Sequence, residues 1–372
     1  MKLAYVCADP GIPVRGVKGA SVHLRSLAGA LSYRGHDVLL ACARTEGTNP
    51  VPEGVRLIEL PGGAGADWLR AAFLEHGTEA VLERHALGGG AALEAAASLE
   101  LPCALEVNAP LVDEASRFRG LEDVQRWRDW ERALLTRAPR LIVVSTAIRR
   151  YAVELGVDPT RVSVVPNGVD QELFGRGDGL SVRSRLGLGD ALVVGFAGSL
   201  KPWHGVRVLV EAFAQLPFDG RLLVVGTGPE LESLQELAVA RGVGDRSIFT
   251  GAIAHGEVPD HVSAMDIATA PFEPMPGFYF SPLKVAEYMA AGRAVVASRQ
   301  GDIPELIGNA GVLVAAGDVG ALRGALVRLG RDSALRRRLG QAAMSRARSL
   351  TWDTVAGRVE GVLCAPPLGA AR

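Results

Sequence analysis

One local pattern occurs twice in this sequence, and it restricts the fold more than any other feature. Residues 2–8 form an apolar run as long as one strand, and a loop rich in Gly and Pro follows them. Apolar residues then recur at helical spacing over residues 24–31, and a second apolar run fills residues 37–41. This order of strand, loop, helix and strand predicts a βαβ unit, in which the two strands are parallel.

The same order returns in the second half of the chain. Residues 191–198 predict a strand, 206–213 a helix with one apolar face, and 221–226 another strand. A chain of 372 residues is also too long for one typical domain. We therefore predict an α/β protein with two Rossmann-like, doubly wound parallel-sheet domains facing across a cleft. Ligands of such domains bind at the carboxyl ends of the strands.

We predict the domain boundary near residue 175. Pro166, Asn167 and Gly168 are typical turn residues, and residues 171–190 show weak hydrophobic periodicity and five glycines. Residues 1–175 and 176–351 are the expected domains. A helix is predicted over about 352–365, and we expect the tail after it to be disordered.

Charge and apolar run lengths exclude several classes of protein. The 40 Lys and Arg residues and 41 Asp and Glu residues give a net charge of −1, so a nucleic acid is not an expected partner. No apolar run reaches the ~18 residues of a membrane-spanning helix. The first apolar stretch stops at Asp9 and Pro10, too early for a secretory signal, so we expect a cytoplasmic protein.

The segment of residues 278–292 has the features of an anion site. Ser281 has N-cap chemistry, and Pro282 suits the first helical position. The free N–H groups of Leu283 and Lys284, the positive end of the helix dipole and the Lys284 ammonium would together bind phosphate.

Glu287 occupies a position on the same helix where the pattern predicts an apolar side chain. It could accept hydrogen bonds from a ligand diol, such as the hydroxyls of a ribose. It could instead form an i, i+3 salt bridge with Lys284, which is worth only a few tenths of a kcal/mol. We favour the ligand, because the salt bridge does not explain the cap, the proline and the position together.

A second candidate phosphate loop is GSLKPWHG, residues 198–205. Its two terminal glycines allow close approach of a ligand, and Lys201 and His204 offer donors. An ordinary loop with a solvated lysine is the alternative. The chain has only four lysines, and Lys18, Lys201 and Lys284 all lie in candidate phosphate loops.

Dinucleotide cofactors are not expected. The loop that contains Gly226 and Gly228 has Leu231 where a dinucleotide fingerprint needs its third glycine. The first domain also lacks the fingerprint between its opening strand and helix. We therefore expect no NAD or FAD, and no other cofactor.

Polar residues in the first domain could meet an acceptor rich in hydroxyls. Arg84, His85 and Asn108 lie at predicted strand ends, although His85 could equally be a structural histidine. Residues 117–137 could form a helix that touches a membrane. Their interleaved acidic residues favour a surface helix with packed tryptophans, so any membrane contact is expected to be peripheral.

Taken together, these motifs resemble the family-four retaining glycosyltransferases of the GT-B fold over nearly the whole chain. The resemblance implies an acceptor domain first, a nucleotide-sugar donor domain second, and a C-terminal helix that returns to the first domain. The matching segments are KGASVHLRSLAGALSYRGHDV, LEVNAPL, VVPNGVD, FAGSLKPWHG, VVGTGP, IFTGAI and SPLKVAEYMAAG.

Carried over by position, the resemblance places Gly19 near the donor diphosphate, residues 250–253 at the base and Glu287 on the ribose. The expected catalytic residues are Lys201, Glu287 and, with less support, His85. The residues expected to bind the donor are Gly19, Ser199, Lys201, His204, Gly205, Gly228, Thr250, Ile253, Ser281, Leu283, Lys284 and Glu287.

The chain departs from the family pattern at three positions. Ser199 and His204 replace the commoner Arg and Lys, and Tyr279 replaces the first Glu of the family's E-x7-E motif. Lys201 is expected to compensate for the missing cations. The Tyr279 replacement removes a carboxylate expected beside the transferred sugar, which shifts the donor contacts to the backbone of residues 280–284.

The resemblance implies transfer with retention, in which the departing phosphate takes the proton of the acceptor and no protein nucleophile is needed. No D-x-D sequence is present, so a metal ion is not expected. Domain closure about residues 170–190 would exclude water. The expected reaction moves a hexose-like sugar from a nucleoside diphosphate sugar, with UDP favoured, to a hydroxyl of a small molecule, saccharide or lipid-linked acceptor.

Two other functions remain open at this point. A sugar-nucleotide epimerase on the same scaffold would need acid and base groups around the sugar, and Tyr279 weakens that reading more than it weakens transfer. A protein that binds nucleotide sugars without turnover is the alternative that is not an enzyme.

Overall fold

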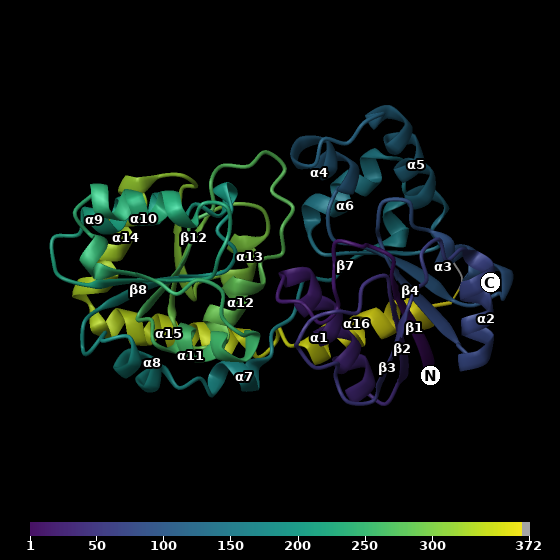
Figure 1. Ribbon diagram of the computed structural model, residues 1–372, viewed down its shortest axis with the longest axis horizontal. Helices are drawn as coiled ribbons and strands as arrows, with labels where there is room; N and C mark the ends of the chain where they lie inside the picture. The colour runs from purple at the N-terminus through teal and green to yellow at the C-terminus, as the bar shows by residue number, and fades with distance from the viewer. Residues whose placement is uncertain (367–372) are drawn as a thin grey trace. The chain divides into compact units, whose positions relative to one another are not determined.

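The computed structural model describes residues 1–366 and divides into two compact units (Figure 1). The first unit contains Met1–Asn167, the short segment Tyr279–Ser281, and α16 (Trp352–Cys364). The second contains Gly168–Phe278 and Pro282–Thr351. Of the tail predicted to be disordered, residues 367–372 lie outside the described part.

The first unit is built on a seven-stranded parallel sheet in the order β3-β2-β1-β4-β5-β6-β7. Its strands are β1 (Lys2–Cys7), β2 (Asp37–Cys42), β3 (Val55–Glu59), β4 (Ala80–Arg84), β5 (Cys103–Val107), β6 (Leu141–Val143) and β7 (Val162–Val164). Its helices are α1 (Gly19–Tyr33), α2 (Ala66–His76), α3 (Ala91–Ser98), α4 (Leu111–Phe118), α5 (Val124–Arg137), α6 (Thr146–Glu154) and α16, with a 3₁₀ turn η1 (Pro159–Arg161).

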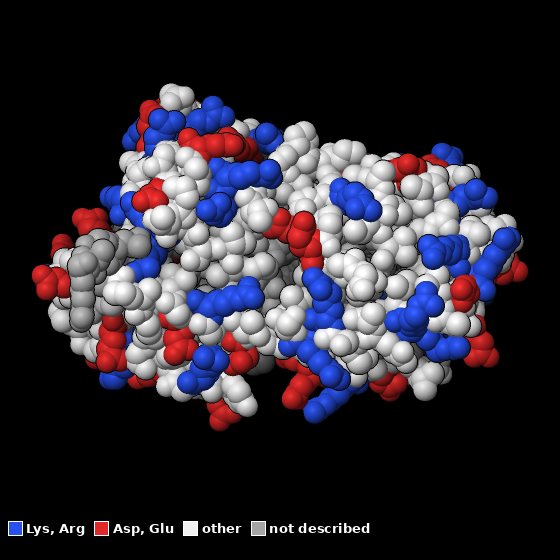
Figure 2. Space-filling view, turned by 180° about the vertical axis from the view of Figure 1, so that it is seen from behind, with Lys and Arg blue, Asp and Glu red and all other residues white. Residues whose placement is uncertain are grey.

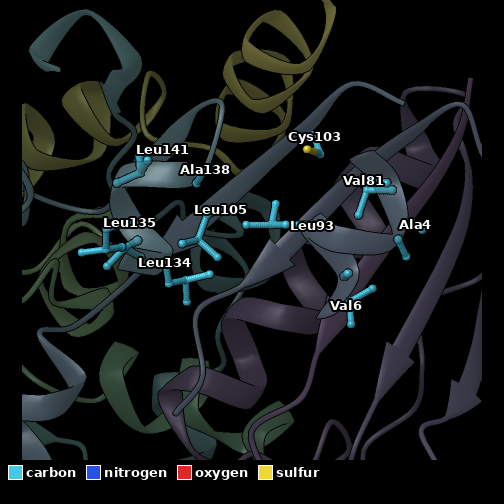
Figure 3. Packing of buried hydrophobic residues seen from close by; sticks show 14 of the residues in the cluster. Ala4, Val6, Val81, Leu93, Cys103, Leu105, Leu134, Leu135, Ala138 and Leu141 are labelled. Carbon is cyan, nitrogen blue, oxygen red and sulfur yellow. The ribbon is translucent and has the colours of Figure 1, made fainter. Parts of the chain in front are cut away.

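The central strands β4 and β5 are buried along their whole length and β1 is buried after Lys2, which explains their largely apolar sequences. Leu93 of α3 and Leu134 and Leu135 of α5 pack with Leu105 of β5 in the core of the unit (Figure 3). Burial of this apolar surface is the main stabilising term for such a unit.

The register of the sheet also aligns charged residues. Arg84 lies between Cys7 and Glu106 on the neighbouring strands. Since side chains alternate along a strand, Arg84 and Glu106 share one face and Glu83 points to the other. There the Glu83 carboxylate accepts hydrogen bonds from the backbone N–H groups of Gly90 (2.6 Å) and Leu93 (2.8 Å) at the start of α3.

The second unit has a six-stranded parallel sheet in the order β10-β9-β8-β11-β12-β13, the strand order of a Rossmann fold. Its strands are β8 (Val193–Ala197), β9 (Arg221–Val225), β10 (Ser247–Phe249), β11 (Ile267–Ala270), β12 (Ala294–Ser298) and β13 (Gly311–Val314). Its helices are α7 (Gln171–Gly175), α8 (Gly179–Arg185), α9 (Val206–Ala214), α10 (Leu231–Ala240), α11 (Val258–Ser263), α12 (Leu283–Ala290), α13 (Ile303–Ile307), α14 (Val319–Arg331) and α15 (Ser333–Ala347), with 3₁₀ turns η2 (Pro202–His204), η3 (Gly244–Arg246) and η4 (His255–Glu257). The prediction of two parallel-sheet α/β domains is confirmed.

Residues 170–190, where a hinge is predicted, contain two short capped helices. The Asp170 and Asp178 side chains accept hydrogen bonds from backbone N–H groups at the start of α7 and α8. Gly177 lies against the backbone of α11, where a Cβ would overlap the Pro259 carbonyl oxygen. Gly177 and Gly179 therefore serve close packing, whereas a Cβ at Gly175, Gly187 or Gly189 would meet no neighbour.

The surface charges are mixed in sign. On the face shown in Figure 2, basic and acidic side chains both occur over the whole surface. Within the described residues, no helix is long and apolar enough to cross a membrane. The helix predicted near residues 117–137 is α5, whose Leu134 and Leu135 are buried in the core of its own unit.

Candidate functional site

The predicted phosphate loop of the second unit lies beside the start of α12. A Cβ at Gly198 would lie 2.8 Å from the Lys284 Nζ atom, so the glycine makes room for this ammonium. The Nζ atom lies 4.0 Å from the centre of the Phe196 ring and 5.4 Å from that of Phe272. Both rings offer cation–π attraction.

The Lys284 ammonium is buried and unpaired. Its Nζ atom has no hydrogen-bond partner among the described residues. Burial lowers the pKa of Lys284 to about 7, although the nearby Glu287 carboxylate opposes this shift. An unpaired buried cation is unfavourable in a protein, so a bound anion would stabilise the Lys284 ammonium.

Glu287 follows one turn later on α12 and is half-buried. Burial raises the pKa of Glu287 to about 7, against the opposing effect of Lys284. The i, i+3 salt bridge considered from the sequence has no direct hydrogen bond here, because the Lys284 Nζ atom has no hydrogen-bond partner among the described residues. This leaves the Glu287 carboxylate available for a ligand.

The helix begins differently from the prediction. It starts at Leu283 with Pro282 at the N-cap position, and no side chain caps it. The Ser281 Oγ atom instead accepts a hydrogen bond from the Asn167 backbone N–H at 2.9 Å. The expectation that Ser281 caps the helix is therefore wrong, because another backbone donor takes its hydroxyl.

Tyr288, which the sequence did not single out, fixes α12 on the sheet. Its hydroxyl donates to the Ala197 carbonyl oxygen (3.1 Å) and accepts from the Ala197 N–H (2.7 Å) at the end of β8. Because Gly198 and the candidate loop follow directly, this pair of bonds sets the distance between the loop and Lys284. The tyrosine of KVAEYMAAG was the available signal for these contacts, but it could not be paired with Ala197 of VVGFAG without the fold.

His204 is held in a neutral form in the same loop. Its Nδ1 atom lies 2.5 Å from the Ser199 carbonyl oxygen, which can only accept, so Nδ1 carries the proton. Burial, followed by the Lys284 charge, lowers the pKa of His204 to about 3. His204 therefore presents a bare Nε2 atom, and the positive charge of the loop comes from Lys201.

Gly205 and Gly228 are placed by packing within the unit. Gly205 has a φ of +67°, and a Cβ there would overlap the Pro271 carbonyl oxygen. Gly228 lies against the backbone of Leu200. Close approach to a ligand is thus not needed to explain either glycine.

The predicted base-binding segment lies beside these loops. Gly226 contacts the Gly198 carbonyl, and its N–H donates to the Gly251 carbonyl oxygen at 3.1 Å. Thr250 N–H donates to the Val224 carbonyl oxygen, and Ile253 follows half-buried. The structure thus brings most of the predicted donor residues together at the carboxyl edge of one sheet.

Gly19, Ser281 and Tyr279 lie in the first unit. Gly19 is the first residue of α1. The Tyr279 hydroxyl donates to Glu114 Oε2 at 3.0 Å, and its carbonyl oxygen accepts from the Ser145 hydroxyl at 2.8 Å. Burial and the Glu114 charge raise the pKa of Tyr279, so it stays protonated and cannot replace the missing carboxylate.

Of the predicted acceptor residues of the first unit, Arg84 and His85 are buried and Asn108 is half-buried. Arg84 Nη1 lies 3.4 Å from Glu106 Oε2 in an internal ion pair. His85 stacks on Trp130, and burial followed by the Arg84 charge lowers the pKa of His85 to about 3. His85 Nε2 lies 3.5 Å from Glu131 Oε1, and the Asn108 Oδ1 atom has no hydrogen-bond partner in the described chain.

Two family models match the chain, one in each half. "Glycosyltransferase Family 4" matches residues 17–173, and "Glycosyl transferases group 1" matches residues 191–332. The chain belongs to the family-four glycosyltransferases. The family resemblance inferred from the motifs is thereby confirmed.

This glycosyltransferase is similar to D-inositol 3-phosphate glycosyltransferases. That of Stackebrandtia nassauensis is 35% identical over 221 residues, covering 55% of this chain and 48% of the relative. That of Acidothermus cellulolyticus is 34% identical over 250 residues, covering 63% of this chain and 54% of the relative. The chain thus spans about half the length of the curated relatives that it matches.

Solved structures resemble this glycosyltransferase over nearly its whole length. Sucrose-phosphate synthase from Thermosynechococcus elongatus has a TM-score of 0.79 at 22% identity, covering 97% of this chain and 98% of that one. Anabaena HepE in complex with UDP-glucose has a TM-score of 0.76 at 21% identity, covering 98% of this chain and 99% of that one. These similarities support the GT-B fold.

Proposed function

We propose that this family-four member moves a hexose-like sugar from a nucleoside diphosphate sugar to an acceptor hydroxyl. The observation that carries the proposal is the Lys284 ammonium, which is buried at the start of α12 without a hydrogen-bond partner. The free N–H groups and positive dipole end of that helix add to its field. A diphosphate has the charge and the oxygen atoms to occupy this position.

UDP is the favoured nucleotide and glucose the first sugar to test. The support is the similar fold of Anabaena HepE, whose structures contain UDP and UDP-glucose. An inositol phosphate is the first acceptor to test, since the similar curated enzymes are D-inositol 3-phosphate glycosyltransferases. Saccharide and lipid-linked acceptors follow it.

The proposed chemistry proceeds with retention and without a metal ion. The bond between the sugar C1 and the diphosphate oxygen breaks, and a bond from C1 to the acceptor oxygen forms on the same face. The leaving phosphate oxygen takes the acceptor proton. Lys201, Lys284 and the start of α12 stabilise the negative charge that develops on the diphosphate, and Glu287 accepts hydrogen bonds from the ribose.

The test begins with calorimetric titration of the full chain with UDP, GDP and ADP, each with and without EDTA. Tight binding of UDP alone, unchanged by EDTA, would support the donor site. Incubation with UDP-glucose and inositol 3-phosphate, followed by mass spectrometry and NMR of the anomeric proton, then tests transfer and retention. An epimerised nucleotide sugar as the product, or no binding of any nucleotide, would overturn the proposal.

A further inference from the structure

The chain passes between the two units four times. One buried histidine of the first unit, His23, contacts residues at three of these crossings directly or through a neighbour. The first unit ends at Asn167, resumes for Tyr279–Ser281, and resumes again at Trp352. His23, on α1 of the same unit, contacts Asn167 and Trp352 directly and Ser281 through Asn167. All four residues belong to the first unit.

The contact with Ser281 runs through the Asn167 side chain. The Asn167 Nδ2 group donates to the Ser281 carbonyl oxygen at 2.7 Å, and the Asn167 backbone N–H donates to Ser281 Oγ at 2.9 Å. Because the carbonyl can only accept, the amide nitrogen must face Ser281. The amide oxygen of Asn167 then faces the His23 Nδ1 atom, at 2.7 Å.

The other nitrogen of the His23 ring also faces an acceptor. His23 Nε2 lies 2.5 Å from Glu106 Oε1, and the second Glu106 oxygen accepts from the Tyr5 hydroxyl at 2.6 Å. Burial raises the pKa of Glu106, but His23, followed by Arg84 and Tyr5, lowers it to about 2 overall. Glu106 is therefore ionised and accepts only.

Two acceptors on one imidazole ring are both satisfied only when both nitrogens carry protons. Glu106 lies beside one of these nitrogens, and the side chains of His23 and Glu106 are about 5% exposed or less. Trp352, the first residue of α16, packs edge-on against the His23 ring with 5.2 Å between ring centres. His23 thus faces an acceptor at each ring nitrogen, Glu106 at Nε2 and Asn167 at Nδ1.

We infer that His23 is a positioning residue that fixes Asn167 and Ser281 and thereby the approach of the chain to the donor helix α12. Ser281 precedes the first residue of that helix, Leu283, by only two positions. The Ser145 and Glu114 contacts hold Tyr279 at the other end of the segment. The expected effect of His23 on nucleotide binding rests on the proposed function. The expected effect of His23 on the order of residues 279–281 does not.

The test compares His23→Gln with a matched control, His76→Gln. His76 is another buried histidine of the first unit, and its ring contacts Thr78 and Asp37 instead. Gln at position 23 can donate toward Glu106 or Asn167 but cannot reproduce both ring donors. Hydrogen exchange of the unliganded full chain, measured by mass spectrometry, reports on residues 279–284 without any donor present.

We expect exchange in residues 279–284 to become about tenfold faster in His23→Gln and Asn167→Ala and to stay unchanged in His76→Gln. Binding of UDP should weaken about tenfold in the first two variants. The double variant should bind no more weakly than Asn167→Ala alone, because His23 acts through Asn167. A purely structural role would instead make the two effects multiply.

Wild-type exchange rates in the segment of His23→Gln, or multiplied effects in the double variant, would overturn the inference. If the wild-type chain binds no nucleotide, the proposed function fails, and the exchange measurement still decides the role of His23. If His23→Gln does not fold, Ser281→Ala replaces it, since this change removes the hydroxyl bound by Asn167 and leaves the pair of His23 and Glu106 intact. The same faster exchange is then expected, and an unchanged rate would refute the inference.

Discussion

Replacing Lys284 with Met should stabilise the unliganded protein and weaken donor binding at the same time. The Nζ atom lies over the rings of Phe196 and Phe272 and has no hydrogen-bond partner in the described chain. Methionine has a similar length without the charge, and its sulfur packs well against aromatic rings. The substitution therefore removes an unfavourable charge from the free protein and a favourable one from the donor complex.

The pKa of Lys284 gives the size and sign of the stability effect. Burial lowers this pKa from 10.5 to about 7, so the folded state binds the proton less tightly than the unfolded chain. Stability of the wild type should therefore rise as the pH rises from about 7 toward 10.5. The shift corresponds to at most ~4 kcal/mol at pH 7, and we expect ~1–2 kcal/mol because the stem of Lys284 is partly exposed to solvent.

Calorimetric unfolding at about pH 7 and about pH 9 measures this effect. A gain of ~1–2 kcal/mol should raise Tm by about 2–8 °C for a unit of this size, and the gain should be about half as large at the higher pH. Lys2→Met is the control, since the Lys2 Nζ atom donates to the His76 carbonyl oxygen at 3.0 Å and its loss should not stabilise. A Lys284→Met protein that is less stable than the wild type at pH 7, and binds UDP equally well, would refute the reasoning.

Four further outcomes are expected. Glu287→Ala should raise the donor KM about 10- to 100-fold with a smaller change in kcat, measured by initial rates, because it removes the charged acceptor for the ribose hydroxyls. Because the pKa values of Glu287 and Lys284 both lie at about 7, the two groups have opposite effects on donor affinity as the pH rises through this value, and titration calorimetry of Glu287→Gln, in which only Lys284 titrates, should show a steeper fall in affinity than the wild type. Lys201→Ala should lower kcat by ~10² in single-turnover assays, and an unchanged rate would assign the leaving-group charge to Lys284 alone. Gly205→Ala should destabilise the protein by ~2 kcal/mol or more in denaturant unfolding, whereas Gly175→Ala, where a Cβ meets no neighbour, should change stability little.

The sheets were the part of the fold most accessible from the sequence. Buried parallel strands need apolar side chains on both faces, so runs such as residues 2–8 and 221–226 are visible without any tertiary information. The glycines of residues 171–190 have two possible physical roles. Gly177 allows contact with the backbone of α11, and only the fold distinguishes this close packing from flexibility.

The local sequence signals of the candidate donor site could be predicted, but the contacts between its distant residues could not. Loop glycines, lysines and a helix start are local signals, and they singled out Lys201, Lys284 and Glu287, which all lie in the second unit. The aromatic rings around Lys284 come from β8 and from the residues after β11, so no local pattern joins them. Ser281 shows the same limit, because its cap chemistry was real but a distant backbone donor at Asn167 competes for the hydroxyl.

The identity of residue 284 explains how the unliganded site can exist. An arginine keeps its charge under all ordinary conditions, so an unpaired guanidinium between Phe196 and Phe272 would remain a buried cation whenever the donor is absent. Lysine can release its proton in the same place, and burial brings the pKa of Lys284 to about 7, near the conditions of a working enzyme. The sequence uses arginine for nearly all of its positive charges but has lysine at the start of α12. In the proposed site this residue is a cation when a diphosphate is bound and can lose its proton when no diphosphate is bound.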